Sequence, residues 1–298
     1  MSEAKDIAVE FTDIAPRVSE FRRFSNVFFS RKIVIVGLVI ILGLIIVAIF
    51  APLLAPYKPD TINMEQSLLQ PSGEHLLGTD TLGRDTLSRL IYGSRISLMV
   101  GIIAVGIAAS IGMTLGLIAG YFGGMTFVVI MRLMDAIMAI PMIALALVIA
   151  AFLGGGLKNV MIAVGIALMP MYARLMCGQV LSIRENDYVV AGRAIGAKSV
   201  RILFGHILPN CLPPLIVQMT MMMGTAILTE ASLSFLGIGI EPPSAAWGSM
   251  ITDGYRYLLT NPVLSFAPGV AIMLVVYGFN MVGDGLRDAL DPRLRGML

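Results

Sequence analysis

The sequence is short of charge. Only 13% of its 298 residues are Asp, Glu, Lys or Arg, while 57% are hydrophobic. Soluble domains average about 25% charged residues. A chain with so little charge cannot cover the surface of a water-soluble fold, so its composition places it among membrane proteins. The net charge of +2, without any dense Lys/Arg cluster, argues against a nucleic-acid partner.

Residues that bind metals or act as nucleophiles are equally scarce. The two cysteines, Cys177 and Cys211, and the two histidines, His75 and His206, show no metal-ligand spacing, and we interpret the cysteines as reduced, buried thiols. The GAKS tetrapeptide at 196–199 lacks the upstream glycine of a phosphate-binding loop, and hydrolase and zinc-protease motifs are missing. We therefore expect no metal site, no cofactor and no enzymatic activity.

What the chain does contain is long apolar segments. Six are long enough to cross a membrane as helices, at about residues 33–51, 96–119, 127–153, 159–177, 212–235 and 263–282. The second carries five glycines that would let helices approach closely, namely Gly101, Gly106, Gly112, Gly116 and Gly120. Pro141 should kink the third. The predicted fold class is an all-α integral membrane protein with six transmembrane helices.

The loop after the first span is the largest polar stretch between two spans. Residues 75–98 have a partial apolar face, which predicts a short amphipathic helix lying at the membrane interface. Within it, Asp80 and Asp85 can offset Arg84 and Arg89.

Basic residues indicate the orientation. With six spans, both termini lie on one side, and that side carries 15 of the 21 Lys and Arg residues. This bias predicts that both termini are cytoplasmic. The expected parts are a cytoplasmic segment 1–32, the first span and extracytoplasmic loop 33–95, a membrane core 96–284 that includes a cytoplasmic loop 184–210, and a cytoplasmic tail 285–298. Trp247, Tyr255 and Tyr257 suit a membrane–water interface.

The cytoplasmic loop 184–210 has its own helix signals. A first helix should begin at Asn186 or Asp187 and end at Gly196, where a left-handed residue is favoured. A second should run from about Ser199 to Pro209, which would stop it. Its apolar stripe consists of Val200, Leu203, Phe204 and Ile207. A helix–glycine–helix element between spans suggests docking on another protein, although turn chemistry alone could produce such a loop.

Ionisable residues within spans are costly in a membrane and therefore need an explanation. Asp135, Glu230 and Asp284 lie near span ends, which favours interfacial placement or structural pairs, such as Asp135 with Arg132 three residues away. An ion-coupled carrier more often has charged residues or broken helices at mid-membrane, in repeated halves. No internal repeat is evident.

Five sequence blocks, taken in order, resemble one family. DYVVAGRAIGAKSVRILFGHILPN (187–210) is similar to the cytoplasmic "EAA" loop of ABC importer permeases. Four further blocks resemble the second permease subunit of dipeptide, oligopeptide and nickel transporters: HLLGTDTLGRDTLSRLIYGSRISL (75–98), MRLMDAIMAIP (131–141), LTEASLSFLGIGIEPPSAAWG (228–248) and FNMVGDGLRDALDPR (279–293). Val190 stands where the general EAA pattern has an acid.

The resemblance implies a type I ABC importer permease fold in the prokaryotic inner membrane. It also implies a second permease subunit as heterodimer partner, two ABC ATPases that each receive one such loop, an extracytoplasmic substrate-binding protein, and surrounding lipid. The residues expected to couple to the ATPases are Tyr188, Ala191, Gly192, Arg193, Gly196, Arg201, Leu208 and Pro209. Met219, Met222 and Met223 are candidates for the substrate pathway.

Several readings of function stay open at this point. Di- and oligopeptides are the expected substrates, but relatives of this kind also move nickel complexes or glutathione. A self-contained carrier or channel is the alternative from another class. A membrane-embedded enzyme or a structural scaffold is a third, and the enzyme form finds no nucleophile or metal constellation in the sequence.

Overall fold

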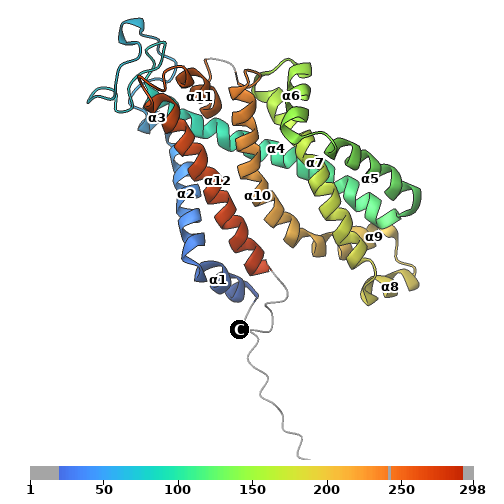
Figure 1. Cartoon of the computed structure of the whole chain (residues 1–298). Helices are drawn as coiled ribbons and strands as arrows, with labels where there is room; N and C mark the ends of the chain where they lie inside the picture. Colours follow the sequence, from blue (N-terminus) through green and yellow to red (C-terminus); the bar gives the residue numbers. More distant parts are fainter. Residues whose placement is uncertain (1–19, 241–242, 291–298) are drawn as a thin grey trace, which may run out of the picture.

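The computed structural model describes residues 20–240 and 243–290, and within these ranges the chain is a bundle of helices joined by loops (Figure 1). The α-helices are α1 (Glu20–Ser30), α2 (Lys32–Ile49), α3 (Ala51–Leu54), α4 (Thr86–Phe122), α5 (Gly124–Met138), α6 (Met142–Leu153), α7 (Gly156–Ile183), α8 (Asp187–Ala194), α9 (Ser199–Ile202), α10 (Leu208–Phe235), α11 (Trp247–Tyr255) and α12 (Val263–Leu290). A 3-10 turn at Met64–Gln66 and a π-helical turn at Leu203–Ile207 complete the set. The all-α class is confirmed. Residues 1–19 of the predicted N-terminal segment and 291–298 of the tail lie outside the described residues.

The long helices correspond to the apolar segments. Among the described residues, five helices can cross a membrane by length and composition: α2, α4, α7, the stretch Ser199–Phe235 that includes α10, and α12. Helices α5 and α6 pass the same test only together and are bent by 92° at the break that contains Pro141, as in a broken span or a re-entrant loop. The predicted kink at Pro141 is confirmed. It is a complete break, because α5 ends at Met138 and α6 begins at Met142.

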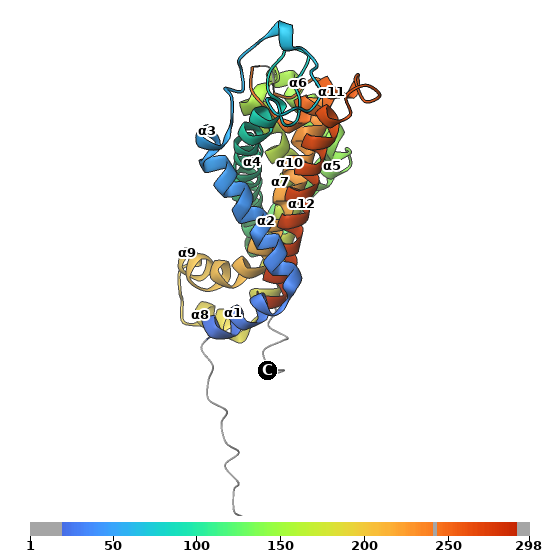
Figure 2. The same cartoon turned by 90° about the vertical axis from the view of Figure 1, so that its left-hand side faces the viewer.

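The bundle has two distinct ends. Helices α3, α6 and α11 lie at one end, called here the upper end, and α1, α8 and α9 lie at the other, the lower end (Figures 1 and 2). Helix α4 crosses behind α10 and α7, while α2 lies against α12 at one edge of the molecule.

The packing of α4 on α7 depends on glycine. A Cβ atom added at Gly112, Gly116 or Gly120 would overlap backbone or Cβ atoms of α7. These residues are four apart and share one face of α4, so the two backbones can approach closely there. Gly106, by contrast, faces open space and Gly101 contacts Met223. The predicted close approach is confirmed for three of the five glycines.

The segment predicted as an interfacial helix is only partly helical. Residues 75–85 form a turn-rich loop in which Gly78 and Gly83 have positive φ. The helix begins at Thr86, where the Asp85 carboxylate accepts a hydrogen bond from the Ser88 N–H at 2.7 Å, and then continues without a break as α4. The helix predicted at 75–98 as leading into the second span is therefore present only from Thr86, because an N-cap inside the segment starts the membrane span itself.

Trp247 is not an interface anchor. It is 3% exposed, its ring lies where a side chain at Gly93 would be, and its indole N–H donates a hydrogen bond of 2.9 Å to the carbonyl oxygen of Leu90. The ring locks α11 onto α4. Tyr255, in contrast, is 59% exposed.

Two helices run further than predicted. Pro209 does not end the second loop helix: α9 passes through the π turn into α10, where Pro209 occupies the first turn and needs no N–H partner. Helix α12 likewise continues past residue 282 to Leu290, so it includes Asp284 and the first part of the predicted tail.

Candidate coupling site

The lower-end segment 184–210 is built from local signals. Helix α8 begins after Asn186, whose backbone is extended, and Asp187 in its first turn complements the positive end of the helix dipole. At the other end the N–H of Gly196 bonds to Arg193 O at 3.0 Å and that of Ala197 to Gly192 O at 3.1 Å. With Gly196 at φ +79°, this is a Schellman motif. The glycine stop predicted from sequence is confirmed.

Four apolar side chains hold the segment to the bundle. Val189, Ile202, Leu203 and Ile207 are each at most 8% exposed and join the cluster that contains residues of α7. The predicted stripe on the second helix therefore divides. Leu203 and Ile207 face the protein, whereas Val200 and Phe204 do not.

The opposite side of the segment exposes large apolar side chains. They are Tyr188 (46% exposed), Val190 (50%), Ile195 (85%), Val200 (66%) and Phe204 (60%). Ile195, Gly196, Lys198 and Arg201 also line a shallow hollow at the turn between α8 and α9. Exposed apolar groups beside basic ones are typical of a protein-binding surface.

Two arginines tie the segment to α4 as well as to α7. Arg184 donates a hydrogen bond of 2.9 Å from Nη1 to the carbonyl oxygen of Gly120, and the Arg193 guanidinium lies 5.2 Å from the centre of the Tyr121 ring. The ring contact is a cation–π interaction. A displacement of α8 would thus be passed to the tightly packed α4–α7 pair.

The residues predicted to couple to a partner are not all on one surface. Tyr188, Ala191, Arg193, Gly196 and Arg201 are exposed on the segment, and Gly192 is half-buried on it. Leu208 and Pro209 instead begin α10, and Pro209 lines a different hollow between α7, α10 and α12.

Sequence reasoning missed the most exposed apolar residue of the segment, Ile195, and passed over Val190 except as a departure from a pattern. A signal was available. Tyr188, Val189 and Val190 are three consecutive apolar residues on a short helix, and only one of three can face the bundle. In the structure that residue is Val189.

The methionines of α10 divide in a similar way. Met219, Met222 and Met223 are half-buried and pack against other helices. Met221 lines the hollow between α7, α10 and α12, together with polar side chains of Gln179, Asn210, Gln218 and Arg287. The hollow has a volume of about 700 Å³ and is larger than the one at the coupling turn.

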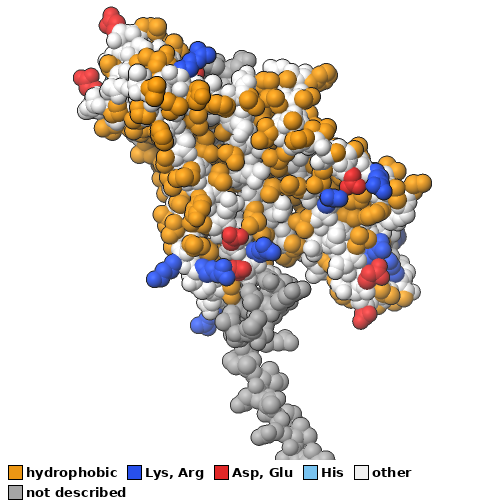
Figure 3. Space-filling model, viewed as in Figure 1, with side chains coloured by type: hydrophobic (Ala, Val, Ile, Leu, Met, Phe, Trp, Pro, Cys, Tyr) orange, Lys and Arg blue, Asp and Glu red, His pale blue; other side chains and the backbone are white. Residues whose placement is uncertain are grey.

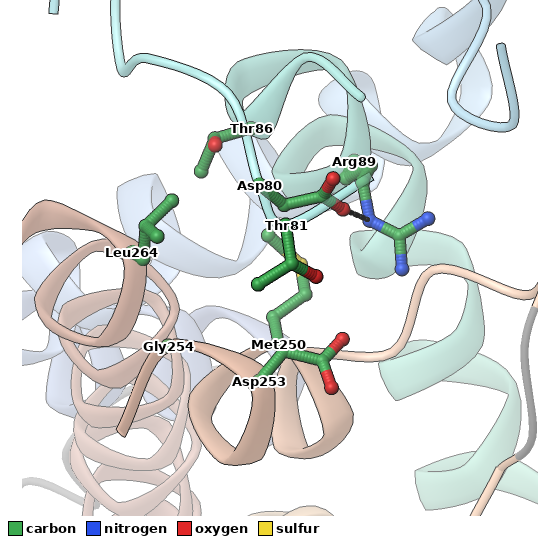
Figure 4. Close-up of a pocket in the computed structure, with 8 residues that line it drawn as sticks. All are labelled: Asp80, Thr81, Thr86, Arg89, Met250, Asp253, Gly254 and Leu264. Atoms are coloured by element: carbon green, nitrogen blue, oxygen red, sulfur yellow. Dashed lines mark ion pairs between the residues drawn. The ribbon is translucent and has the colours of Figure 1, made fainter. Parts of the chain in front are cut away.

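The upper end contains a buried network of charges (Figure 4). Asp80 Oδ2 lies 2.6 Å from Arg84 Nε and 3.5 Å from Arg89 Nε, and Asp253 of α11 approaches Arg84 at 3.8 Å. The prediction that Asp80 and Asp85 offset Arg84 and Arg89 holds for Asp80, which lies near both arginines, whereas Asp85 pairs with His75 at 2.9 Å. The network joins the 75–85 loop to α4 and α11.

Arg95 binds backbone carbonyl groups instead of a carboxylate. It donates hydrogen bonds from Nε to Ala48 O (2.5 Å) and from Nη2 to Ile49 O (3.0 Å), the last carbonyls of α2. A basic side chain at a helix C-terminus satisfies groups that have no partner within the helix.

Each of the three acidic residues predicted near span ends either has a side-chain partner or is exposed. Asp135 pairs with Arg132 at 3.9 Å, as predicted, and also with Arg174 of α7 at 3.0 Å. Glu230 is 1% exposed and accepts a hydrogen bond of 2.7 Å from Ser234 Oγ, so it is a buried residue and not an interfacial one. Asp284 is exposed.

Membrane-crossing helices that end in a protruding, capped helix–glycine–helix element define the membrane component of a multi-subunit transporter. The chain belongs to the family of binding-protein-dependent transport system inner membrane components, whose model matches residues 112–296. The model of the N-terminal transmembrane domain of oligopeptide transport permease C matches residues 19–71. The chain is therefore a multi-pass membrane permease, as the resemblance implied.

Similar proteins extend over nearly the whole chain. The dipeptide transport system permease protein DppC of Alkalihalophilus pseudofirmus is 46% identical over 286 residues, which are 96% of this chain and 93% of the relative. The oligopeptide transport system permease protein OppC of Bacillus subtilis is 42% identical over 268 residues, 90% of this chain and 88% of the relative.

A solved structure of the MetNI methionine ABC transporter in an inward-facing conformation aligns with a TM-score of 0.56 and 22% identity, over 68% of this chain and 96% of that chain. The likeness is one of fold. It confirms the type I ABC importer permease fold predicted from the sequence.

Proposed function

We propose that the chain is one of the two permease subunits of an ATP-driven importer of dipeptides and oligopeptides. The single observation that carries the proposal is the coupling segment: a rigidly capped helix whose outer side exposes Tyr188, Ile195 and Phe204 while its inner side is anchored in the bundle. The names of the relatives favour peptides over nickel complexes or glutathione.

In this proposal the lower end is cytoplasmic. The coupling segment of each permease sits in a cleft of one of two ATPases, which bind ATP and Mg²⁺, and this chain has no catalytic role. The second permease completes the pathway. A substrate-binding protein delivers peptide to the upper end, where the charged network fixes the surface of the 75–85 loop.

Coupling then requires that the contacts between the ATPase and α8 differ between the conformational states of the transporter. ATP can shift the permease only to the extent that its ATPase binds one position of α8 better than another. The links from Arg184 to Gly120 and from Arg193 to Tyr121 are the route by which such a shift reaches α4.

The test compares two exposed apolar residues at opposite ends of the bundle. Ile195 is 85% exposed on the coupling segment and Leu259 is 101% exposed at the upper end. Each is changed to Asp in the complete transporter. We expect Ile195→Asp to reduce co-purification of the ATPases and ATP-dependent dipeptide uptake at least tenfold, because a charge is buried at the contact without a partner. Leu259→Asp should leave co-purification unchanged.

Retention of the ATPases and of uptake by Ile195→Asp would contradict the coupling assignment. Uptake by the permeases alone in liposomes, driven by an ion gradient, would support the self-contained carrier instead.

A further inference from the structure

A groove of about 410 Å³ runs between α5 and α7 in the lower half of the bundle. Its lining combines uncharged and charged residues. The uncharged ones are Phe127, Val128, Met131, Cys177, Gly178 and Leu181, and the charged ones are Arg132, Asp135 and Arg174. The coupling segment lies below it, and the function proposed above does not account for it.

The charges in the groove do not balance. Asp135 accepts a hydrogen bond of 3.0 Å from Arg174 Nη2, but Arg132 reaches the same carboxylate only at 3.9 Å, beyond hydrogen-bonding distance. The side chains of Arg132 and Arg174 are 82% and 53% exposed. One carboxylate therefore faces two guanidinium groups, so the charged residues that line the groove carry a net positive charge.

A face in contact with lipid tails looks different in this same chain. Helix α2 exposes Val39, Leu42 and Ile46 and carries no charged residue after Lys32. Figure 3 shows hydrophobic side chains along most of the α2–α12 side, with charged ones at its two ends, and a further group of charged side chains over α5 and α7. Charges on a membrane helix face water, a partner or another charge and not lipid tails.

A second hollow lies on the other side of α7. Arg174 and Gly178 line the groove, while Leu175 and Gln179, one residue further on, line the hollow shared with α10 and α12. That second hollow contains further polar groups from Gln218 and Arg287. Polar side chains from α5, α7, α10 and α12 therefore line two hollows on either side of α7.

We infer that the α5–α7 groove is a water-filled part of the translocation pathway, in which Arg132 and Arg174 receive the terminal carboxylate of a passing peptide. The inference rests on the proposed function. Peptides of varied sequence share only their backbone and their two charged ends. A guanidinium pair of which one is only loosely held by Asp135 matches a carboxylate by charge and by its paired donors. Because the groove is open and the site half-exposed, binding there is weak enough for the peptide to leave.

The test places a cysteine in the groove. Gly178 is exposed on α7 and has open space where a Cβ would be, so Gly178→Cys fits without strain. Leu133, 56% exposed on the other side of α5, supplies the matched control Leu133→Cys. Both are made in a Cys177→Ala, Cys211→Ala background, in the complete transporter in inverted vesicles. Anionic sulfonatoethyl and cationic trimethylammonium-ethyl methanethiosulfonates are then applied.

We expect Gly178→Cys to react and Leu133→Cys to stay unreactive, with the anionic reagent favoured at position 178. The double change Arg132→Gln, Arg174→Gln should lower the anionic-to-cationic rate ratio about fivefold. Millimolar dialanine with a free carboxylate should slow the anionic reagent in the parent protein, and dialanine amide should not.

Each opposite result overturns the inference. An unreactive Gly178→Cys means that the groove is dry, and equal protection by the acid and the amide removes the role of the carboxylate. Slowing by phosphatidylglycerol in the vesicles but not by dialanine identifies a lipid headgroup site instead. Dialanine uptake is measured in the same transporter. If the parent transports no dialanine, the proposed function is contradicted. If it transports dialanine but dialanine does not slow the anionic reagent at position 178, only the role of the groove is contradicted.

Discussion

The carboxylate of Asp80 lies 2.6 Å from Nε of Arg84, with both side chains buried at the upper end of the bundle. The same oxygen is 3.5 Å from Nε of Arg89, which is 2% exposed. One acid therefore holds two buried arginines, and it also accepts hydrogen bonds from the backbone N–H groups of Leu82 and Arg84. Asp80 therefore stabilises the conformation of the loop 75–85.

Asp80→Asn should destabilise the protein strongly. Removing one partner of a buried ion pair leaves an uncompensated charge, which costs about 3–5 kcal/mol. The expected result is a clear fall in the melting temperature of the detergent-solubilised protein. Glu74→Gln, at an exposed position just before this loop, is the control and should melt like the parent. Equal melting of the two variants would show that the network does not support the fold.

Asp253 should make stability depend on pH. Burial raises the pKa of its carboxyl group, although Arg84 and Arg89 oppose the shift. Between the ordinary pKa and the raised one, the folded protein binds a proton more tightly than the unfolded chain does, so stability falls as the pH rises through that window. Asp253→Asn removes the titration.

The melting temperature of Asp253→Asn minus that of the parent should therefore increase as the pH is raised from about pH 4. Glu65→Gln, in the exposed 3-10 turn, controls for the loss of a carboxyl group. A difference that is flat with pH would show that burial of Asp253 has no effect on its titration.

The α4–α7 contact should not tolerate even one methyl group. A Cβ at Gly116 would overlap the carbonyl oxygen of Ala173, a backbone atom that cannot move aside, so Gly116→Ala should cost about 1–3 kcal/mol or more. Gly106 lies on the same helix and faces open space. Gly106→Ala should be neutral or slightly stabilising, because alanine favours the helix. Thermal melting of the two variants measures the difference, and similar melting would refute the packing argument.

Much of the fold could be predicted because its signals are local. The apolar segments, the break at Pro141 and the left-handed Gly196 each depend on residues a few positions apart. The coupling segment was found for the same reason, since an N-terminal Asn-Asp and a C-terminal glycine are read within one helix. Its exposed residues were harder to identify, because the choice of Val189 over Tyr188 and Val190 as the buried residue is made by α7.

Sequence by itself determined that this chain crosses the membrane several times and presents a capped helix between two spans, because hydrophobic length and backbone conformation are properties of short stretches. Tertiary structure alone decided that Trp247 is buried against Leu90, that Pro209 begins a helix instead of ending one, and that Arg174 joins Asp135. Each of these depends on packing or on a partner far away in the chain, and a side chain is assigned to lipid, water or protein only when the helices have packed.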